Sequence, residues 1–333
     1  MASPNTNFTD LVTTTFNDHA KTMADNFFSS FPLLKKLEAK TRISKDGGNK
    51  IVRPLMYADN STVKFFSGYE TLDITPQTGF SAAEYDWREC NGTVTISNIE
   101  RLKNSGKNQI RNLLNDKKMQ LEKSLRKKFN LALMSDGTGV GTGFADSEAG
   151  KVPLGIKAIV GDDNSGVTTV GNISASSNTW WRSYCDRNGG VARAWDLDLW
   201  KKVYNKASVG TGEFPDLIFT TLDLYLAYEA SQHPMLRYAP NDETANAMFT
   251  GLQLGGALVF WDDMLTHDGV NGDDTYFLNT DYIEFVTHQD SWFTMGEAIK
   301  VPDKAAIWIQ CFSTCQLVTN NRRMHGLITN QTS

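Results

Sequence analysis

Several features of membrane and secreted proteins are missing from this chain of 333 residues. It contains no run of eighteen apolar residues, which a membrane-spanning helix requires, and no basic patch followed by an apolar stretch at its start, which a secretory signal requires. We therefore expect no membrane partner and a protein that stays where it is made. A hydrophobic content of 40% with a mean hydropathy of −0.36 is typical of a soluble globular chain large enough for two lobes.

Cysteine is scarce, with four residues in the whole chain and no Cys-x-x-Cys pair. Cys311 and Cys315 are only four residues apart, but in the strand expected there they would lie about 13 Å from each other, too far for a disulfide. We expect these two cysteines, together with Cys90 and Cys185, to be reduced thiols of the core.

Sequence signatures of catalysis and metal binding are also absent. There is no Gly-x-Ser-x-Gly elbow, no His-Glu-x-x-His pair and no papain-type cysteine motif. The glycine-rich stretch at 137–143 follows an expected helix and matches no phosphate-binding loop. The acidic stretch at 262–274, which includes His267, lacks the glutamate of a calcium loop and is typical of a turn. We predict no catalytic residue, cofactor or metal site, and keep an unrecognised hydrolase as an alternative, because catalytic triads assemble in space.

The strongest positive signal is an apolar pattern between Lys107 and Met134 with spacings of three, four and seven residues. It predicts one long helix with a single buried face, which we call the spine helix. Ser105 is a candidate N-cap, and Gly137 lies where a left-handed residue would end the helix. At about 1.5 Å per residue the helix would span roughly 40 Å. The apolar face consists of Ile110, Leu113, Leu114, Leu121, Leu125, Phe129, Ala132 and Leu133.

The spine helix is strongly basic. Between Arg101 and Lys128 there are ten Lys or Arg residues against Asp116 and Glu122, a balance of +8, so the rest of a chain with net charge −5 sums to −13. A solvent-exposed face of an amphipathic helix explains this pattern. An acidic neighbouring subunit or a polyanion would explain it as well, so a basic-helix nucleic-acid-binding protein is a second alternative.

Between residues 51 and 96 the apolar period changes to two, which predicts a pair of strands. β-Branched and aromatic residues fill 62–69, and a Pro-containing turn at 71–79 would join two arms of up to roughly 50 Å. A two-stranded ribbon of this length is marginally stable alone and exposes its edges, so it needs a partner surface. Alternatively, the arms fold back into a larger sheet.

The remaining segments suggest an arm and a second lobe. The first 45 residues are too apolar for a free tail, yet Pro32 interrupts their pattern and no core of their own is evident, so we expect this arm to pack on another surface. A long β-rich run at 305–320 would return the chain to a sheet beside the spine helix. The second lobe is α/β in kind. Its expected elements are helices at 197–207 and 223–231 and strands at 216–220, 257–261 and 275–279.

Several segments, taken in their order along the chain, resemble the major capsid proteins of tailed bacteriophages, which share the Hong-Kong-type capsid fold. The resemblance covers most of the chain from about Gly47 onward. It implies an α+β fold with an N-terminal arm (1–49), an extended hairpin loop (50–98), a peripheral domain with the spine helix (99–196 and 284–333) and an axial α/β domain (197–283). The segments are GGNKIVRPLMYADN (47–60), FSGYETLD (66–73), YDW (85–87), the spine helix, PDLIFTT (215–221) and WIQCFSTCQLVTNNRRMHGL (308–327).

The resemblance implies a structural protein and no enzyme. Such proteins assemble with themselves into pentamers and hexamers, form an icosahedral shell around double-stranded DNA and need no cofactor. The expected location is the virion capsid, assembled in the host cytoplasm. Because some relatives carry a long removable scaffolding segment at the N-terminus and this chain has only a short arm, the resemblance suggests a separate scaffolding protein in addition to a portal.

The resemblance also suggests which residues contact neighbouring subunits. For the charges of the spine helix we favour subunit contact over DNA contact, because the rest of the chain supplies abundant acids. Some relatives link a loop lysine covalently to an asparagine, but Lys64, Asn320 and Asn321 are ordinary polar residues and we do not expect that link. The predicted contact residues are Lys64, Phe66, Tyr69, Glu70, Lys117, Lys118, Lys127, Lys128, Arg322 and Arg323.

Overall fold

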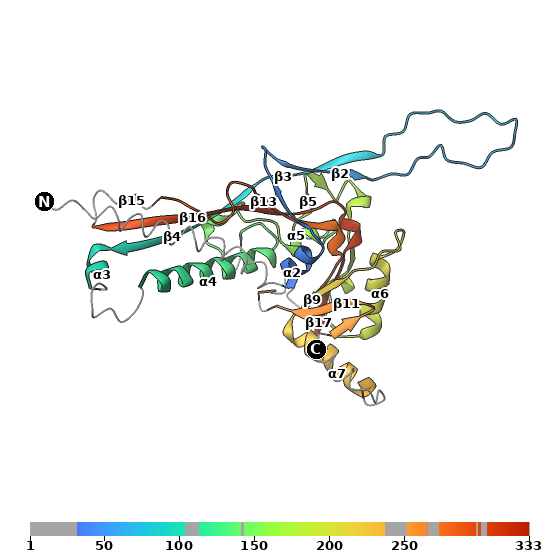
Figure 1. Ribbon diagram of the computed structural model, residues 1–333. Coiled ribbons are helices and arrows are strands. Elements are labelled where there is room, and N and C mark those ends of the chain that lie inside the picture. The colour runs from blue at the N-terminus through green and yellow to red at the C-terminus, as the bar shows by residue number, and fades with distance from the viewer. Residues whose placement is uncertain are drawn as a thin grey trace.

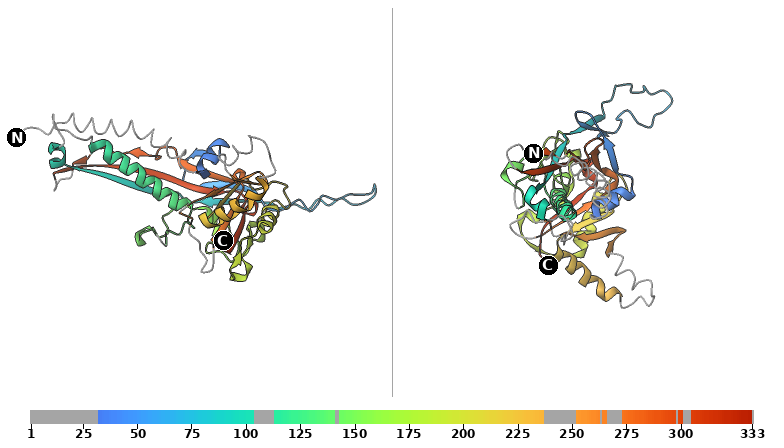
Figure 2. Two further views of the ribbon diagram at one scale, coloured as in Figure 1. Left: turned by 90° about the horizontal axis from the view of Figure 1, so that it is seen from below. Right: turned by 60° about the vertical axis from the view of Figure 1, so that its left-hand side comes forward.

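The computed structural model describes residues 32–103, 113–140, 143–236, 252–262, 264–265, 273–297, 299–300 and 305–332. They form an elongated subunit built on two sheets (Figure 1). One sheet is long and runs beside the spine helix, and the other is compact and carries two further helices. A long loop without regular secondary structure projects from the body on the side opposite the spine helix (Figures 1 and 2).

The first sheet is organised around its longest strand, β16. On one edge β16 pairs with β4, and along its other edge lie β13, β14 and β15, all antiparallel to it. β1 extends the sheet in parallel beside β13. The predicted β-rich run at 305–320 is therefore confirmed as a strand. The bounds are β1 Ile43–Asp46, β4 Arg88–Ser97, β13 Ile283–His288, β14 Thr294–Met295, β15 Ile299–Lys300 and β16 Ala306–Thr319.

The predicted hairpin is shorter than expected. β2 (Ile51–Met56) and β3 (Phe80–Tyr85) pair along their whole length, from Ile51 opposite Tyr85 to Met56 opposite Phe80. The chain then leaves the hairpin, because β4 pairs with β16 over ten residues. The prediction that the second arm extends to Ile96 is wrong, and the alternative of folding back into a larger sheet holds for this half.

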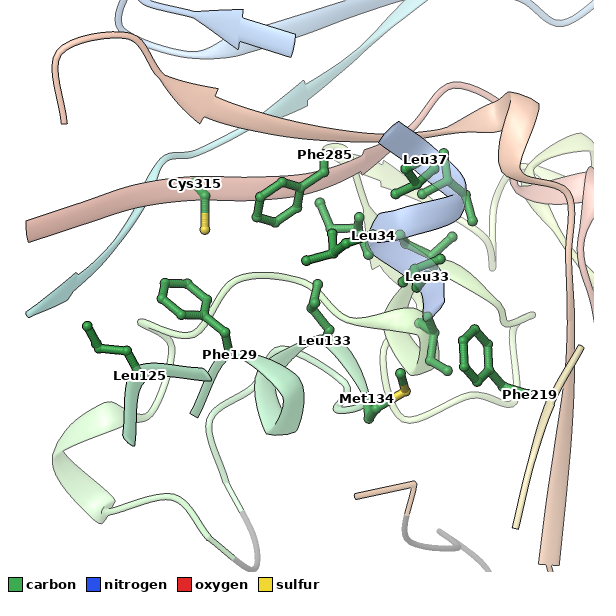
Figure 3. Close-up of a cluster of buried hydrophobic side chains, with 14 of the residues drawn as sticks. Leu33, Leu34, Leu37, Leu125, Phe129, Leu133, Met134, Phe219, Phe285 and Cys315 are labelled. Atoms are coloured by element: carbon green, nitrogen blue, oxygen red, sulfur yellow. The ribbon is translucent and has the colours of Figure 1, made fainter. Parts of the chain in front are cut away.

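The spine helix is α4 (Leu113–Leu133), and its apolar face covers the first sheet. Leu125, Phe129 and Leu133 point toward Phe285 and Cys315 (Figure 3). The cysteines of the described chain are all free, as predicted. The candidate N-cap and the start of the predicted helix, at 105–112, lie outside the described residues. Gly137 has the expected left-handed backbone, with φ of 76°, but it lies in the loop beyond the helix end.

The described part of the arm packs on this chain's own core, which corrects for residues 32–45 the expectation that the arm needs another surface. Pro32 is the first residue of helix α2 (Pro32–Ala39), a position where proline is favoured because its missing N–H would have no helical partner. Leu33, Leu34 and Leu37 are fully buried beside the C-terminal end of α4 (Figure 3). The earlier residues, 1–31, lie outside the described part of the chain.

The second sheet has the strand order β10-β11-β9-β12-β17-β7, with β8 also beside β17. Two helices, α6 and α7, pack on it through a separate core that includes Trp200, Tyr228 and Phe277. The predicted helices and strands of the α/β lobe are confirmed, with bounds shifted by a few residues. The bounds are β7 Tyr184–Asp186, β8 Arg193–Ala194, α6 Leu197–Ala207, β9 Leu217–Thr220, α7 Leu222–Leu236, β10 Leu252–Leu254, β11 Ala257–Trp261, β12 Asp273–Leu278 and β17 Gly326–Thr332.

The two sheets are joined by charge as well as by apolar contact. Lys40, just after α2, lies 2.9 Å from the Asp216 carboxylate at the start of β9, and Thr280 donates to the same carboxylate. These partners hold the pKa of Asp216 below its usual range although burial alone would raise it. The second sheet also includes β7, β8 and β17, which lie outside the range 197–283 expected for the axial domain. The four domain boundaries stay a prediction.

Short elements complete the fold. A small hairpin of β5 and β6 packs under the base of the β2–β3 hairpin, where Val170 and Ile173 share a core with Ile51 and Trp181. The bounds are α3 Asn98–Lys103, α5 Ile156–Ile159, β5 Thr169–Val170 and β6 Ile173–Ser174, with 3-10 turns at Asp146–Glu148, Thr179–Trp181, Asn188–Gly190, Thr280–Tyr282 and Arg322–Met324.

Gly155, which precedes α5, packs closely against the backbone at the C-terminal end of α4. A Cβ atom at this position would lie 2.5 Å from the Ala132 carbonyl oxygen and 2.6 Å from that of Leu133. Because backbone atoms cannot rotate away, Gly155→Ala should lower the free energy of unfolding by about 1–3 kcal/mol in urea denaturation. Gly166→Ala is the matched control, since nothing lies within 4 Å of its Cβ position. Equal effects of the two changes would contradict this packing.

Candidate assembly surfaces

The projecting loop, residues 57–79, joins β2 to β3 and is held firmly at its base. The Tyr57 amide donates to the Gly79 carbonyl at 2.9 Å, and the Tyr57 ring stacks on Trp180 with centroids 5.0 Å apart. Below the loop, the Arg53 guanidinium donates two hydrogen bonds to Glu284, at 2.7 and 3.0 Å, which ties β2 to β13. These contacts anchor both ends of the loop, which projects away from the body (Figure 2).

Within the loop, local hydrogen bonds replace a strand ladder. The Thr75 amide and hydroxyl both donate to Asp73, which holds the pKa of that carboxyl below its usual range. Asn60 accepts from Thr62 in the same way. Lys64 donates across the loop to the Thr71 carbonyl at 3.3 Å. The prediction of a strand at 62–69 is wrong, because short polar side chains fold the backbone into turns.

The large apolar side chains of the projecting loop are exposed. Phe65 and Tyr69 have the accessibility of free residues, and Phe66 is 61% exposed. The predicted contact residues Lys64 and Glu70 are also exposed on this loop. An apolar cluster of this kind on a narrow projection is typical of a protein interaction site. The exposed large side chains of the loop are Val63, Phe65, Phe66, Tyr69, Leu72 and Ile74.

Two of the predicted contact lysines of the spine helix bind partners within the subunit. Lys117 donates to the Thr95 carbonyl at 2.6 Å and to Glu100 at 3.1 Å. Lys128 lies 2.6 Å from Glu148, and its ammonium sits 4.8 Å above the Phe144 ring. The pairing lowers the pKa of Glu148 although its partial burial opposes this. Lys117 and Lys128 therefore hold neighbouring segments against α4.

The outward charge of α4 comes from other residues. Lys123 and Lys127 are exposed, and Arg126 pairs with Glu122 one turn earlier on the helix. The structure does not describe the side chains of Arg101, Lys103 and Lys118, and Lys107 and Arg111 lie outside the described residues altogether. We expected the acidic partners of the spine helix on a neighbouring subunit. Some of these partners, Glu100 and Glu148, belong to the same subunit.

A groove of about 660 Å³ lies between α4 and β4. Leu121, Leu125 and Phe129 form its floor, and Gly92 on β4 lets Leu121 approach the strand, since a Cβ there would lie 2.5 Å from the leucine methyl group. The rim is polar. It includes Thr93 and charged side chains that already form ion pairs within the subunit. An apolar floor of this kind suits a peptide segment with apolar side chains better than a charged small molecule.

Of the two predicted contact arginines, Arg322 is buried and Arg323 is exposed. Arg322 is fully buried and donates to the carbonyls of Ala158 and Ile159, each at 2.9 Å, at the end of α5. Burial lowers the pKa of Arg322 to about 10. Arg322 therefore acts inside the subunit, which corrects its assignment as a contact residue. Arg323 is exposed and donates to the Val209 carbonyl.

His325 was not singled out by the sequence analysis, and no local signal marks it. It is fully buried, and its Nδ1 accepts from the Asn279 amide at 3.2 Å. Burial and the neighbouring Arg322 lower the pKa of His325 to about 3, so it is a neutral group that positions the start of β17.

Neither a metal site nor a membrane helix emerges from the described residues. Across those ranges, no three His, Cys, Asp or Glu side chains are grouped as a metal ion would require. The acidic turn around His267 lies largely outside the described residues. Among the helices that are described, none has the length and apolar character needed to cross a membrane.

Solved structures with the same architecture are viral and bacterial shells. The capsid of cyanophage A-1(L) is 14% identical, with a TM-score of 0.65 over 88% of this chain and 91% of the other. The procapsid of satellite phage P4 is 11% identical, with a TM-score of 0.52 over 94% and 90%. An encapsulin complex from Synechococcus elongatus is 10% identical, with a TM-score of 0.52 over 90% and 88%.

These matches establish the fold. It is the Hong-Kong-type capsid fold, as the sequence resemblance implied. No protein-family model and no curated protein matches the sequence.

The internal ion pairs of α4 lead to a stability prediction. Replacing Lys117 and Lys128 together by Gln should lower the free energy of unfolding by roughly 0.5–1.5 kcal/mol, because Thr95 and Glu148 lose charged partners that are only partly exposed. The matched control replaces Lys123 and Lys127, which are exposed, and should change it by less than about 0.5 kcal/mol. Urea denaturation at low salt measures both, since urea is uncharged and does not screen the ion pairs; a larger loss in the control would contradict the assignment.

Proposed function

We propose that this chain is the major capsid protein of a tailed bacteriophage. Copies of it form pentamers and hexamers that close into an icosahedral shell around double-stranded DNA. The observation that carries the proposal is the fold, which the chain shares with a cyanophage capsid over 88% of its length. The exposed apolar residues of the projecting loop support it, because a lone subunit leaves them without cover.

The proposal assigns separate roles to the parts of the fold. The projecting loop lies over a neighbouring subunit and contributes Lys64, Phe66, Tyr69 and Glu70 to that contact. The first sheet with α4 forms the peripheral domain of the shell wall, and the second sheet forms the axial domain near the capsomer centre. Arg323 remains a proposed contact, since it is exposed beside the second sheet.

The remaining partners follow from this role. A separate scaffolding protein directs assembly in the host cytoplasm, a portal occupies one vertex, and the packaged DNA is bound without sequence preference. The procapsid of satellite phage P4 is a shell that includes a size determination protein, which illustrates such an accessory factor. The mature location is the virion capsid.

Electron microscopy of the purified protein tests the proposal. We expect pentamers, hexamers or closed shells when the chain is produced alone or with its scaffold. A protein that stays monomeric at all concentrations and salt conditions would refute it and favour the enzyme alternative. A monomer or dimer that binds DNA with a steep salt dependence would favour the nucleic-acid-binding alternative. Shells that enclose protein cargo instead of DNA would indicate an encapsulin.

The exposed charges of α4 are proposed to face a neighbouring subunit rather than the genome. The chain outside 101–128 carries a net charge of −13, and only part of it is used by the internal pairs of Lys117 and Lys128. Contacts between subunits act during assembly and are screened over about 8 Å at physiological salt, whereas phosphate contacts matter only after DNA enters.

Charge removal separates these two roles. Replacing Lys118 and Lys127 by Gln keeps a good helix propensity, so any effect reports on charge. We expect slower assembly of empty shells, by roughly two- to tenfold, with a weaker salt dependence in light scattering. The Lys117 and Lys128 variant serves as the comparison. An unchanged assembly rate combined with less stable DNA-filled particles would instead assign these lysines to the genome.

Shortening the projecting loop tests its role in assembly. Replacing residues 62–75 by Asn-Gly removes the exposed apolar side chains but keeps β2, β3 and the stacking of Tyr57 on Trp180. We expect a folded subunit with an unchanged circular dichroism spectrum that forms no shells, as seen by sedimentation. As a control, Asp59→Asn, which changes an exposed loop residue outside the removed segment and outside the proposed contact, should retain assembly. Loss of folding in the shortened chain would place the loop in the core.

A further inference from the structure

Within the described part of the chain, a short row of backbone groups on the outer edge of β4 has no partner strand. In an antiparallel pair, each residue directs its N–H and C=O either toward its partner strand or away from it, in alternation. The Asn98 amide donates to the Ala305 carbonyl, so the even-numbered residues of β4 face β16 and the odd-numbered residues face outward. β4 has no second strand among the described residues.

At the C-terminal end of β4, side chains already bond to the outward-facing backbone groups. The Ser97 amide donates to the Glu100 carboxylate at 3.0 Å, and the Thr95 carbonyl accepts from Lys117 at 2.6 Å. Both contacts confirm that odd-numbered residues face outward. For Thr93, Asn91 and Glu89 the described residues supply no such partner. These three positions leave an open edge with room for a strand of about six residues.

The groove described above runs along the same edge. Its floor of Leu121, Leu125 and Phe129 lies beside the open positions, so a strand added to β4 would place alternate side chains on an apolar surface. Backbone groups repeating along an edge are satisfied by another extended polypeptide, because only it carries donors and acceptors at the same spacing.

Residues 11–16 of this chain have the composition of such a strand. They read Leu-Val-Thr-Thr-Thr-Phe, a run of β-branched residues with large apolar groups at both ends. The chain up to Phe31 carries three Asp and one Lys, opposite in sign to the basic α4. The geometry points to residues 11–16 of the same subunit adding to the open edge of β4 as an extra strand.

The connection is long enough for this arrangement. Leu33 lies beside Met134, at the C-terminal end of α4, and the groove starts at Ala132 on the same helix (Figure 3). From Ala132 to Lys117 the helix spans about 22 Å. The fifteen residues between Phe16 and Pro32 can extend roughly 50 Å, so they reach the whole groove from where α2 begins. The inference concerns a single subunit and does not depend on shell formation.

Residue-resolved hydrogen exchange on the full-length, unassembled subunit tests the inference. The amides of Glu89, Asn91 and Thr93 should exchange slowly in the intact chain. Thr14→Pro removes an N–H from the added strand and disfavours it, so these amides should then exchange at least about tenfold faster. The even-numbered amides of Cys90 and Gly92, which bond to β16, should stay protected in every variant and report that the subunit is folded.

Thr22→Pro is the matched control, because it makes the same change outside residues 11–16 and should leave the odd-numbered amides protected. Fast exchange of those amides in the intact chain would overturn the inference. Protection that is unaffected by Thr14→Pro would overturn it as well and assign the edge to another segment. Protection that grows with protein concentration would assign it to a second copy instead.

Discussion

The antiparallel pairing of β4 with β16 is the constraint on which the rest of the subunit depends. The two strands are joined over ten residues, although more than 200 residues separate them in sequence. This pairing fixes the face on which Leu125 and Phe129 of α4 are buried, and it determines where the β2–β3 hairpin leaves the body. Because a shift by one residue would exchange the two faces of β4, the core and the register specify each other.

Elements with a strong local pattern could be predicted from the sequence, and those defined by distant partners could not. The spine helix and the α/β lobe were found because their periodicity is contained in each segment. The apolar alternation of β4 was also visible, but nothing local shows that its partner is β16 rather than the preceding arm. Pro32 interrupts the apolar pattern and so suggests a break, although the same residue starts a helix when apolar positions follow it.

Charged residues were the least predictable part of the candidate site. A count of +8 along 101–128 suggested an acidic neighbour, but Lys117 and Lys128 find Glu100 and Glu148 in the same subunit. Arg322 looks like a surface residue in a pair of arginines, yet the carbonyls that end α5 surround it. Sequence reveals a charge but not its counter-charge, because burial and pairing arise only after the chain has folded.

The pairing of β4 with β16 also makes the resistance of the subunit to force depend on the direction of the force. The hydrogen bonds that join two strands run across the strand axis. A pull along that axis therefore loads all bonds of the ten-residue ladder in shear at the same time, whereas a pull across it would peel them apart one by one. β13, β14 and β15 continue the same support along the opposite edge of β16. The subunit should be stiffest along this strand and should yield first where β2 and β3 stand alone as a pair.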